Sequence, residues 1–371
     1  MTKIFVTGAT GYIGGDALKT IVDAHPEYEI TALVRNTDKG TQVAAQYARV
    51  KLVYGDLDSV DLITKEAERA DIISNQPRPP PLPDFANADH IPSAKALTAG
   101  LGAGQHSPTH PGFLIHTSGT GILLFTDIRA GTYGEASAKI YDDLENVSEV
   151  TSLPDDAPHR PVDKIVLAAG TEHGERVKTA IVCPPTIYGT GRGPGNQVSH
   201  QLPELCRATL TLGHGIQVGK GKSRWGNVHV RDLSRLYLRL VEEAAAGGST
   251  AEWEGKPGVW GAEGYFFCEN GEHEWGEIGG LVAKEAEKLG LIEKGQGVRS
   301  LGREEADRCT VWGSALWGAN SRARAKRARA VLGWEAVEGV TIEGDVRGTL
   351  GREARVLGKV VGHAEVAAGD A

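Results

Sequence analysis

The sequence predicts an α/β protein built on a doubly wound parallel sheet, with a smaller lobe toward its C-terminal end. Three observations support this fold class. Short segments rich in β-branched residues alternate with helical stretches through the first half of the chain, and strands separated by helices form parallel sheets. A glycine-rich turn follows the first of these segments and opens a helix. From about Tyr188 onward, glycine-rich loops, tryptophans and more widely separated helices replace the alternation.

The predicted strands are short apolar runs bounded by polar or glycine-containing turns. They are Lys3–Thr7, Glu29–Val34, Lys51–Tyr54, Asp71–Ser74, Phe113–Thr117 and Thr179–Cys183. The predicted helices are long enough to cross such a sheet or to pack on one another. They are Gly15–Ala24, Leu57–Arg69, Ala94–Gly100, Val162–His173, Val230–Ala246, Glu277–Leu289 and Arg322–Leu332. We therefore expect a first domain over residues 1–187, a second lobe over 188–350 and a C-terminal tail over 351–371.

The overall composition is typical of a soluble globular protein. Of the 371 residues, 40% are hydrophobic and 24% are charged, and a chain of this length forms one large domain or two closely connected ones. The net charge of −8 provides no attraction for nucleic acid or for an anionic membrane. No segment has the pattern of a signal peptide or the length of a membrane span. We expect a soluble, cytoplasmic protein.

The cysteines and histidines predict neither a disulfide framework nor a metal site. His106 and His110 are four residues apart, but Pro108 and Pro111 break any helix that would bring them onto one face. The four cysteines are far apart and form no C-x-x-C pair, which favours a reducing compartment. They are Cys183, Cys206, Cys268 and Cys309.

Two segments of biased composition interrupt the pattern. Residues 76–85 contain five prolines, a density typical of an exposed polyproline-like loop. A functional segment of this kind would be a docking loop or a lid. The alternative is an insertion without a function, or even an error in the gene model, and we expect an insertion. The basic run Arg322–Arg329 is either a nucleic-acid patch or a solvated helix face. Because the chain is acidic overall, we expect the solvated face.

The strongest functional signal is the turn Thr7–Gly14, a G-x-x-G-x-x-G pattern between the first strand and the first helix. Gly8 permits a tight turn, Gly11 lets the backbone approach a pyrophosphate, and Gly14 lets the helix pack against the strand. Free backbone N–H groups and the helix dipole then face the anion. The turn predicts a nicotinamide dinucleotide site in a Rossmann-type domain. The residues expected to bind it here are Gly8, Thr10, Gly11, Tyr12, Ile13 and Gly14.

The residues after the second and third strands favour NADP(H) as the cofactor. Arg35 stands where an NAD-binding protein of this fold has an acidic residue for the ribose hydroxyls. Arginine can pair with a 2′-phosphate and stack on adenine, although an ordinary surface arginine looks the same in sequence. Asp56 and Leu57, at the end of the third strand, are also expected to contact the cofactor, and Asp56 can accept from the adenine amino group, cap the next helix, or do both. We expect NADP, with NAD as the alternative.

A series of short motifs follows in order from residue 4 to about residue 335. They are Thr7–Gly14, Arg35, Gly55–Leu57, His116–Thr120, Pro184–Gly189, Asn227–Leu233 and Leu332–Trp334. Together they resemble the extended or atypical short-chain dehydrogenase/reductase superfamily. Within it, the nearest resemblance is to NAD-dependent epimerase/dehydratase-like, dihydroflavonol-reductase-like and nucleoside-diphosphate-sugar-epimerase-like fungal proteins. The first motif is specific, whereas the others are individually weak and gain their weight from their order.

The resemblance implies hydride exchange at a carbonyl or alcohol carbon, with the second lobe closing over the substrate. The family's catalytic set is a Ser or Thr after the fifth strand and a Tyr-x-x-x-Lys pair on the next helix. Ser118 or Thr120 matches the hydroxyl, and Lys164 matches the lysine that also holds the cofactor ribose. Arg160 replaces the tyrosine, and arginine cannot donate a proton at neutral pH. Residues 160 and 164 are expected on one helix face, toward the cofactor.

Other residues are implicated less directly. The missing proton donor could be replaced by a nearby Tyr133, Tyr141 or His159, although none has the family's spacing. The resemblance implies that Pro184 lies in the segment that holds the nicotinamide and that Tyr188 and His229 border the substrate. For His229, packing beneath the loop is an equal alternative.

Two functions are consistent with these residues. The first is an NAD(P)-dependent oxidoreductase or epimerase/dehydratase-like enzyme, for example an aldehyde reductase, acting on a small carbonyl, aldehyde or sugar-derived substrate. The second is a catalytically silent dinucleotide-binding regulator, similar to the nitrogen-metabolite-repression proteins, because the family tyrosine is absent. We expect a small-molecule substrate as the partner, allow for a homodimer, and expect neither nucleic acid nor membrane.

Overall fold

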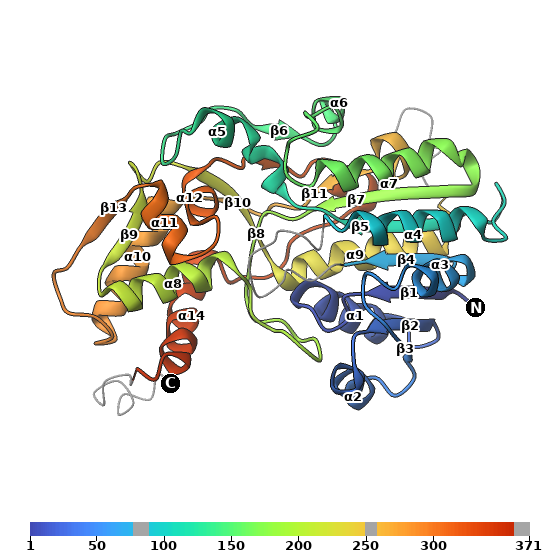
Figure 1. Cartoon of the computed structure of the whole chain (residues 1–371), viewed down its shortest axis with the longest axis horizontal. Helices are drawn as coiled ribbons and strands as arrows, with labels where there is room; N and C mark the ends of the chain where they lie inside the picture. The colour runs from blue at the N-terminus through green and yellow to red at the C-terminus, as the bar shows by residue number, and fades with distance from the viewer. Residues whose placement is uncertain (77–88, 249–257, 360–371) are drawn as a thin grey trace.

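The structure is a computed structural model that describes residues 1–76, 89–248 and 258–359 (Figure 1). Its centre is a seven-stranded parallel sheet in the order β11-β7-β5-β4-β1-β2-β3. The strands are β1 (Lys3–Thr7), β2 (Glu29–Val34), β3 (Lys51–Tyr54), β4 (Ile72–Asn75), β5 (Gly112–Thr117), β7 (Val177–Cys183) and β11 (Tyr265–Phe267). The strand order reverses between β1 and β4, and ligands of open α/β sheets bind at the carboxyl edge of such a reversal.

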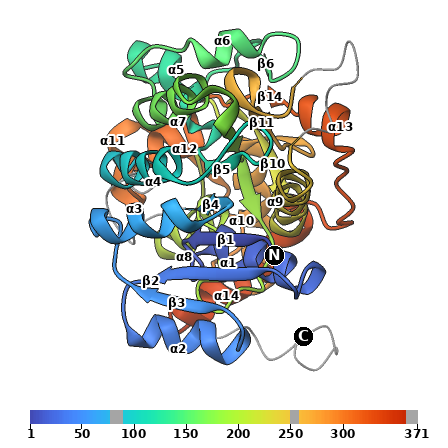
Figure 2. The same cartoon turned by 90° about the vertical axis from the view of Figure 1, so that its right-hand side faces the viewer.

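Helices cover both faces of this sheet (Figure 2). On one face α4 packs between α3 and α7, and on the other α1 packs against α9. The helices around the sheet are α1 (Tyr12–Ala24), α2 (Thr37–Gln46), α3 (Val60–Arg69), α4 (Ile91–Ala103), α7 (Arg160–Glu172) and α9 (Val230–Ala245). Strand residues such as Ile4, Ile73 and Ile115 fill the space between these layers, each at most 1% exposed. This burial on both faces explains why the strands read as continuous apolar runs.

The second lobe contains short sheets and a separate apolar core. Its strands are β8 (Thr186–Tyr188), β10 (Arg224–His229) and β12 (Glu272–Glu274) in one sheet, β9 (Gly215–Val218) with β13 (Val298–Leu301), and β6 (Tyr141–Asp142) with β14 (Ala323–Arg324). Its helices are α5 (Phe125–Ala130), α6 (Val147–Thr151), α8 (Gln201–Leu212), α10 (Trp275–Lys288), α11 (Arg303–Cys309), α12 (Gly313–Gly318), α13 (Arg327–Leu332) and α14 (Ile342–Val356). The separate core of this lobe includes the fully buried Trp275 and Trp317. The elements β6, β14, α6 and α13 instead contribute to the core of the seven-stranded sheet, through Tyr141, Ala323, Val147 and Ala328.

The predicted fold class is confirmed, and β1, β2 and β3 have the predicted bounds. Two predictions about the second half need correction. The chain returns to the first sheet after position 188, because β11 pairs with β7 and α9 packs against α1. The predicted tail from residue 351 is wrong for its first residues, because α14 continues to Val356 and buries Glu353 and Ala354.

The basic run Arg322–Arg329 is not a solvated helix face. The side chain of Arg322 pairs with Glu272, with Nε and Oε2 2.8 Å apart. Arg327 is fully buried, and its Nε donates to the carbonyl oxygen of Asp143 at 2.8 Å. The run is held in place because carboxylates and carbonyl groups of the lobe satisfy its guanidinium groups.

Other expectations concern segments or properties of the whole chain. The proline-rich segment lies almost entirely outside the described residues. All four cysteines are free thiols, and Cys183, Cys206 and Cys268 are buried. Across the three described ranges, no helix combines the length and apolar character needed to cross a bilayer.

Candidate functional site

The glycine-rich turn joins the end of β1 to the start of α1. Gly8 has a φ of +73°, a conformation that glycine adopts without strain, and its carbonyl oxygen accepts from the N–H of Gly11 at 2.7 Å. Gly11 is the N-cap of α1. Since Gly11 has no side chain, nothing from this residue covers the first N–H groups of the helix, which at a helix N-terminus favour an anion.

A second glycine in the turn is required by close packing. A Cβ at Gly14 would overlap the carbonyl oxygen of Gly8 and would lie 3.1 Å from Oε1 of Gln76 at the end of β4. The helix therefore approaches the strand as closely as a dinucleotide-binding turn requires. Together with the open N-terminus of α1, this geometry fits the pyrophosphate of a dinucleotide. The backbone of Gly11, Tyr12 and Ile13 would hold it.

A loop of the second lobe lies against this turn. The N–H of Asn196 donates to the carbonyl oxygen of Thr10 at 2.9 Å, and the hydroxyl of Tyr12 donates to the carbonyl oxygen of Gly189 at 2.7 Å. Gly15 and Gly193 touch backbone to backbone, because a Cβ on Gly15 would lie 3.0 Å from Cα of Gly193. The segment from 189 to 197 is therefore fixed against the candidate cofactor site.

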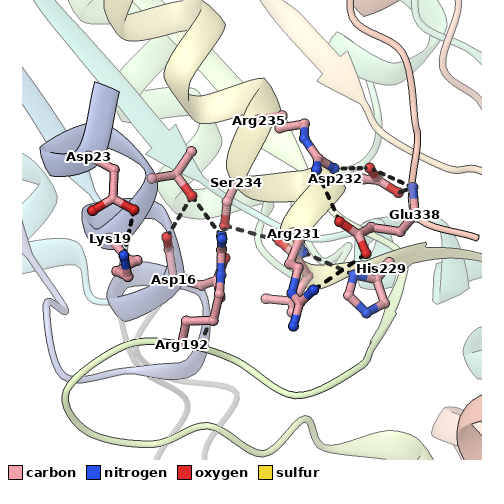
Figure 3. A network of polar contacts seen from close by, with 12 residues as sticks. Asp16, Lys19, Asp23, Arg192, His229, Arg231, Asp232, Ser234, Arg235 and Glu338 are labelled. Atoms are coloured by element: carbon pink, nitrogen blue, oxygen red, sulfur yellow. Dashed lines mark hydrogen bonds and ion pairs between the residues drawn. The ribbon is translucent and has the colours of Figure 1, made fainter. Parts of the chain in front are cut away.

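Arg192 holds this loop to α1 (Figure 3). Its Nη2 and Nε lie 2.7 and 3.0 Å from the carboxylate oxygens of Asp16, and its backbone N–H also donates to Asp16 at 2.8 Å. Ser234 of α9 donates to the same carboxylate at 2.7 Å. Burial raises the pKa of Asp16, but the hydrogen bonds from Arg192 and Ser234 outweigh it and hold the pKa below its usual value. Asp16 is therefore a buried, ionised link between three elements.

The predicted adenosine-side residues lie at neighbouring strand ends. The N–H of Gly55 donates to the carbonyl oxygen of Val34 at 3.0 Å, which brings the residues after β2 and β3 together. Arg35 is exposed there. Asp56 does not cap α3; Oδ1 of Asp56 accepts from Ser59, which is the N-cap of that helix.

Leu57, the other residue predicted on this side, is half-buried and packs against the core of the sheet. Its side chain supports the strand ends that carry Arg35 and Asp56.

A chain of buried polar side chains runs from β1 to α7. Thr7 donates to Oδ1 of Asn75 at 2.5 Å, and Nδ2 of Asn75 donates to Nδ1 of His116 at 2.9 Å. Nε2 of His116 lies 4.0 Å from Oδ1 of Asp163. Burial lowers the pKa of His116 to about 3, so its imidazole is neutral at physiological pH. Thr7, the residue before Gly8, is thus connected through Asn75 to His116 on β5.

The predicted hydroxyls occupy the turn that follows β5. Oγ of Ser118 donates to Oδ2 of Asp163 at 3.0 Å, and the hydroxyl of Tyr265 donates to the same oxygen at 2.9 Å. Burial raises the pKa of Asp163 to about 6. The backbone N–H of Thr120 donates to the carbonyl oxygen of Pro184 at 3.0 Å, which ties the turn to the segment after β7. Ser118 and Thr120 are both buried.

Lys164 does not lie beside these hydroxyls. It is exposed, and its Nζ lies 2.8 Å from Oδ1 of Asp155. Arg160 is also turned away, because its Nε donates to the carbonyl oxygen of Leu153 at 3.0 Å. The apolar face of α7 contains Val162, Val166 and Ala169, and residues 160 and 164 lie about half a helical turn from it. The expected orientation of the Arg160 and Lys164 side chains is therefore corrected: Asp163 is the residue of α7 that contacts Ser118.

His159 precedes α7 and faces the same turn. Its Nδ1 lies 2.9 Å from Oδ1 of Asp89, and its side chain is 9% exposed. A Cβ on Gly121 or Gly119 would lie 3.0 or 3.2 Å from Nε2 of His159, so the imidazole stands directly over these glycines. From the sequence alone, His159 is only one of three candidates to replace the missing tyrosine. Its pairing with Asp89 joins residues 70 positions apart and has no local signal.

The residues expected to border the substrate have defined packing partners. The hydroxyl of Tyr188 donates to the carbonyl oxygen of Val340 at 2.9 Å. His229 is the N-cap of α9, where Nδ1 accepts from the N–H of Arg231 at 3.3 Å, and its ring meets that of Tyr188 edge to face at 5.4 Å. Both side chains are buried, and burial lowers the pKa of His229. These contacts match the alternative that His229 packs beneath the loop.

Family models match two parts of the chain. Residues 8–76 match NAD(P)H-binding, and residues 130–254 match the NAD dependent epimerase/dehydratase family. The oxidase ucsJ of an Acremonium species is 40% identical over 357 residues, which cover 96% of this chain and 99% of that protein. The uncharacterized protein YLL056C of Saccharomyces cerevisiae is 24% identical over 260 residues, 69% of this chain and 76% of that protein.

Solved structures of the same fold include two enzymes of nucleotide-sugar chemistry. The UDP-glucose 4-epimerase of Thermotoga maritima has a TM-score of 0.60 at 14% identity and covers 96% of this chain and 100% of its own. The dTDP-glucose 4,6-dehydratase DesIV of Streptomyces venezuelae, with NAD bound, has a TM-score of 0.62 at 16% identity, and the match covers 96% of this chain and 97% of DesIV. The chain therefore belongs to the NAD-dependent epimerase/dehydratase family, and its first domain matches the NAD(P)H-binding model.

Proposed function

We propose that this protein is an NADP(H)-preferring oxidoreductase that acts on a small carbonyl, aldehyde or sugar-derived substrate. One observation carries the proposal. The glycine-rich turn after β1 and the hydroxyl-bearing turn after β5 lie at the same edge of one parallel sheet, and Asn75 bridges them by its bonds to Thr7 and His116. A dinucleotide at the first turn extends along this edge toward the second.

Each residue has a distinct role in this proposal. When bound, the nicotinamide supplies or accepts the hydride. The backbone of Gly11, Tyr12 and Ile13 holds the pyrophosphate, and Arg35 pairs with the 2′-phosphate. The segment around Pro184 borders the nicotinamide, and Ser118 or Thr120 orients the substrate oxygen by a hydrogen bond. The hydroxyl proton of Ser118 is directed to Asp163, so in this state Ser118 can only accept a hydrogen bond from a substrate hydroxyl. Among the described residues the buried hydroxyl of Thr120 has no partner, so it can donate to a substrate oxygen.

The silent-regulator hypothesis has its own support in the structure. Neither Arg160 nor Lys164 is directed at the hydroxyl turn, since they bind Leu153 and Asp155 instead. A protein with this arrangement could bind the dinucleotide and sense its level without turnover. The two hypotheses share the cofactor site and differ only in chemistry.

Binding and turnover therefore need separate measurements. NADPH and NADH are titrated into the protein by nicotinamide fluorescence, and a panel of aldehydes, ketones and nucleotide sugars is then screened for NADPH oxidation. We expect binding with a preference for NADPH, and oxidation with at least one substrate class. Binding without turnover across the whole panel would favour the regulator. Absence of binding of either dinucleotide would contradict both hypotheses.

A further inference from the structure

We propose that a cluster of four basic side chains on the second lobe binds the dianionic phosphate group of a small ligand. This basic cluster consists of Lys222, Arg224, Arg322 and Arg324. None of the four belongs to the glycine-rich turn or to the hydroxyl-bearing turn. The inference therefore goes beyond the proposed function, and it applies equally to an enzyme and to a silent regulator.

Neighbouring extended segments bring the basic cluster together. Arg224 is the first residue of β10, and its carbonyl oxygen accepts from the N–H of Ser321 at 2.9 Å. The chain then continues through Arg322, the buried Ala323 and Arg324. Because side chains alternate along an extended chain, Arg322 and Arg324 lie on the same side, opposite to Ala323. The pattern of arginines separated by one alanine thus places two guanidinium groups near the start of β10.

Glu272 of β12 is the carboxylate around which the arginines gather. Its two oxygens lie 2.8 and 2.9 Å from Nε and Nη2 of Arg322, a bidentate pair that uses both oxygens. Nη1 of Arg324 and Nη1 of Arg224 lie 3.7 and 3.9 Å from the same carboxylate, beyond hydrogen-bond distance. One carboxylate therefore binds one arginine tightly and keeps two others close to it.

The charges within the basic cluster are not balanced. The second acid on β12, Glu274, lies 2.6 Å from Nζ of Lys222 and 3.5 Å from Nη2 of Arg224. Four positive charges thus face the two negative charges of Glu272 and Glu274, which leaves a net charge of +2. This excess is local, because the chain as a whole has a net charge of −8. An anion is the ligand that it attracts.

The acids on the neighbouring segments face other cations. Lys326 lies 2.6 Å from Asp142 and 3.1 Å from Glu145, and Arg329 lies 3.8 Å from Glu269. Within the part of the chain that the structure describes, none of these acids forms an ion pair with the basic cluster. Their charges act on it only at longer range, where solvent screens them.

Two of the arginines have donors that the protein does not use. The guanidinium group of Arg224 donates no hydrogen bond to any described residue, and that of Arg324 donates only to the carbonyl oxygen of Ala323, at 3.0 Å. An arginine has five N–H donors in a planar fork. The side chains of Arg224 and Arg324 are 45% and 41% exposed, so a ligand from solvent can reach these donors.

A phosphate group matches the basic cluster in charge and in geometry. A phosphate monoester carries a charge of about −2 at neutral pH, which balances the excess, whereas a carboxylate carries only one negative charge. Its tetrahedral oxygens can accept from groups that approach from different strands. Arginine forks bind phosphate through paired hydrogen bonds, and a lysine such as Lys222 adds a point charge. Inorganic phosphate and the phosphate group of an organic molecule share this chemistry.

The test measures anion binding to the full-length protein by isothermal titration calorimetry. Sodium phosphate and glycerol 3-phosphate are titrated separately, with sodium chloride of equal ionic strength as the reference. Arg224→Gln, Arg324→Gln and Arg224→Lys probe the basic cluster. Arg239→Gln is the matched control, since Arg239 is 55% exposed and its ion pair with Glu242 has a separation of 3.5 Å. Because the glycine-rich turn can also bind phosphate, each titration is repeated in Gly11→Asp.

We expect phosphate to bind equally well to the starting protein and to Gly11→Asp. Each arginine-to-glutamine change in the cluster should weaken binding by about tenfold or more, the effect of losing a hydrogen bond to a charged group, and Arg239→Gln should not weaken it. Arg224→Lys should weaken binding to an intermediate extent, because lysine keeps the charge and loses the fork. Tighter binding of glycerol 3-phosphate than of inorganic phosphate would identify an organic phosphate as the ligand, and the opposite order would identify the free ion.

Three results would overturn the inference. The first is the absence of binding of both phosphate compounds to the starting protein. The second is binding that Arg224→Gln and Arg324→Gln leave intact, which would place the phosphate elsewhere. The third is equal affinity in the starting protein and in Arg224→Lys, which would show an adventitious ion only, held by charge alone. Since these measurements require neither NADPH nor turnover, failure of the oxidoreductase function would not change their outcome.

Discussion

Ser118 donates its hydroxyl proton to Asp163 across 3.0 Å, and this bond joins the turn after β5 to the first turns of α7. Tyr265 of β11 donates to the same carboxyl oxygen, and Nε2 of His116 lies 4.0 Å from the other. One buried carboxyl group therefore positions residues from three elements. In the family resemblance the helix contributes a lysine at this edge, whereas here it contributes an acid.

The first prediction concerns the glycine-rich turn. Gly11→Asp should reduce dinucleotide binding below detection, because a side chain and a negative charge would both enter the space next to the pyrophosphate. Fluorescence titration with NADPH measures the effect, and a circular dichroism spectrum identical to that of the starting protein serves as the folding control. Unchanged affinity would remove this turn from the cofactor site.

The second prediction concerns cofactor preference. We expect Arg35→Asp to lower the preference for NADPH over NADH by about tenfold or more, because a carboxylate repels the 2′-phosphate that an arginine attracts. Arg49→Asp is a suitable control, since Arg49 is also exposed but binds the carbonyl oxygen of Pro26. Equal affinities for the two dinucleotides in the starting protein would contradict the assignment of Arg35.

The parts of the fold that the sequence predicts best are those with a local signal. β1, β2 and β3 have the predicted bounds because their β-branched residues end at polar or glycine-containing turns. β11 was not predicted. It has three residues, and its place beside β7 depends on a pairing between Tyr265 and Ile181 that no local pattern reveals.

The candidate site likewise contains some residues with a local sequence signal and others without one. The glycine-rich turn is contiguous, so its spacing alone predicts its geometry. The Asp89 and His159 pair joins distant residues and depends on the packing of two helix N-termini, which cannot be inferred from spacing. The orientation of α7 did have a signal: Val162, Val166 and Ala169 define its apolar face, and on a helical wheel residue 163 lies nearer to that face than residue 164.

The third prediction concerns the stability of the loop that covers the turn. Arg192→Ala should destabilise the protein by about 3 kcal/mol, because it leaves the buried carboxylate of Asp16 without its charged partner. The free energy of unfolding from urea denaturation measures this. Arg239→Ala is the control, since Arg239 is exposed and its ion pair with Glu242 has a separation of 3.5 Å. We expect no measurable change in the control.

The hydrogen bonds from Arg192 to Asp16 also predict that the stability of the fold depends on pH. The pKa of Asp16 in the folded protein lies below its usual value of 3.8, so its ionised form stabilises the fold above that pH, and this contribution is lost as the pH falls through the folded pKa. Asp16→Asn should therefore be less stable than the starting protein at about pH 7, and the difference should shrink at about pH 3. A difference that is the same at both values would show that Asp16 does not stabilise the fold through its charge.

The last prediction separates Asp163 from Lys164. Lys164→Ala should leave both turnover and its pH profile unchanged, because Lys164 is exposed and its pair with Asp155 is a surface ion pair, a kind that contributes little. Asp163→Asn should keep an acceptor for Ser118 but remove a carboxyl group whose pKa burial raises to about 6, so any change in turnover with pH that comes from Asp163 should disappear. Measuring kcat against pH for both variants tests directly which of Asp163 and Lys164 takes part in turnover, and NADPH affinity is the control for the cofactor site. A large loss of turnover in Lys164→Ala, together with an unchanged profile in Asp163→Asn, would restore the lysine to the mechanism and would require α7 to rotate when the cofactor binds.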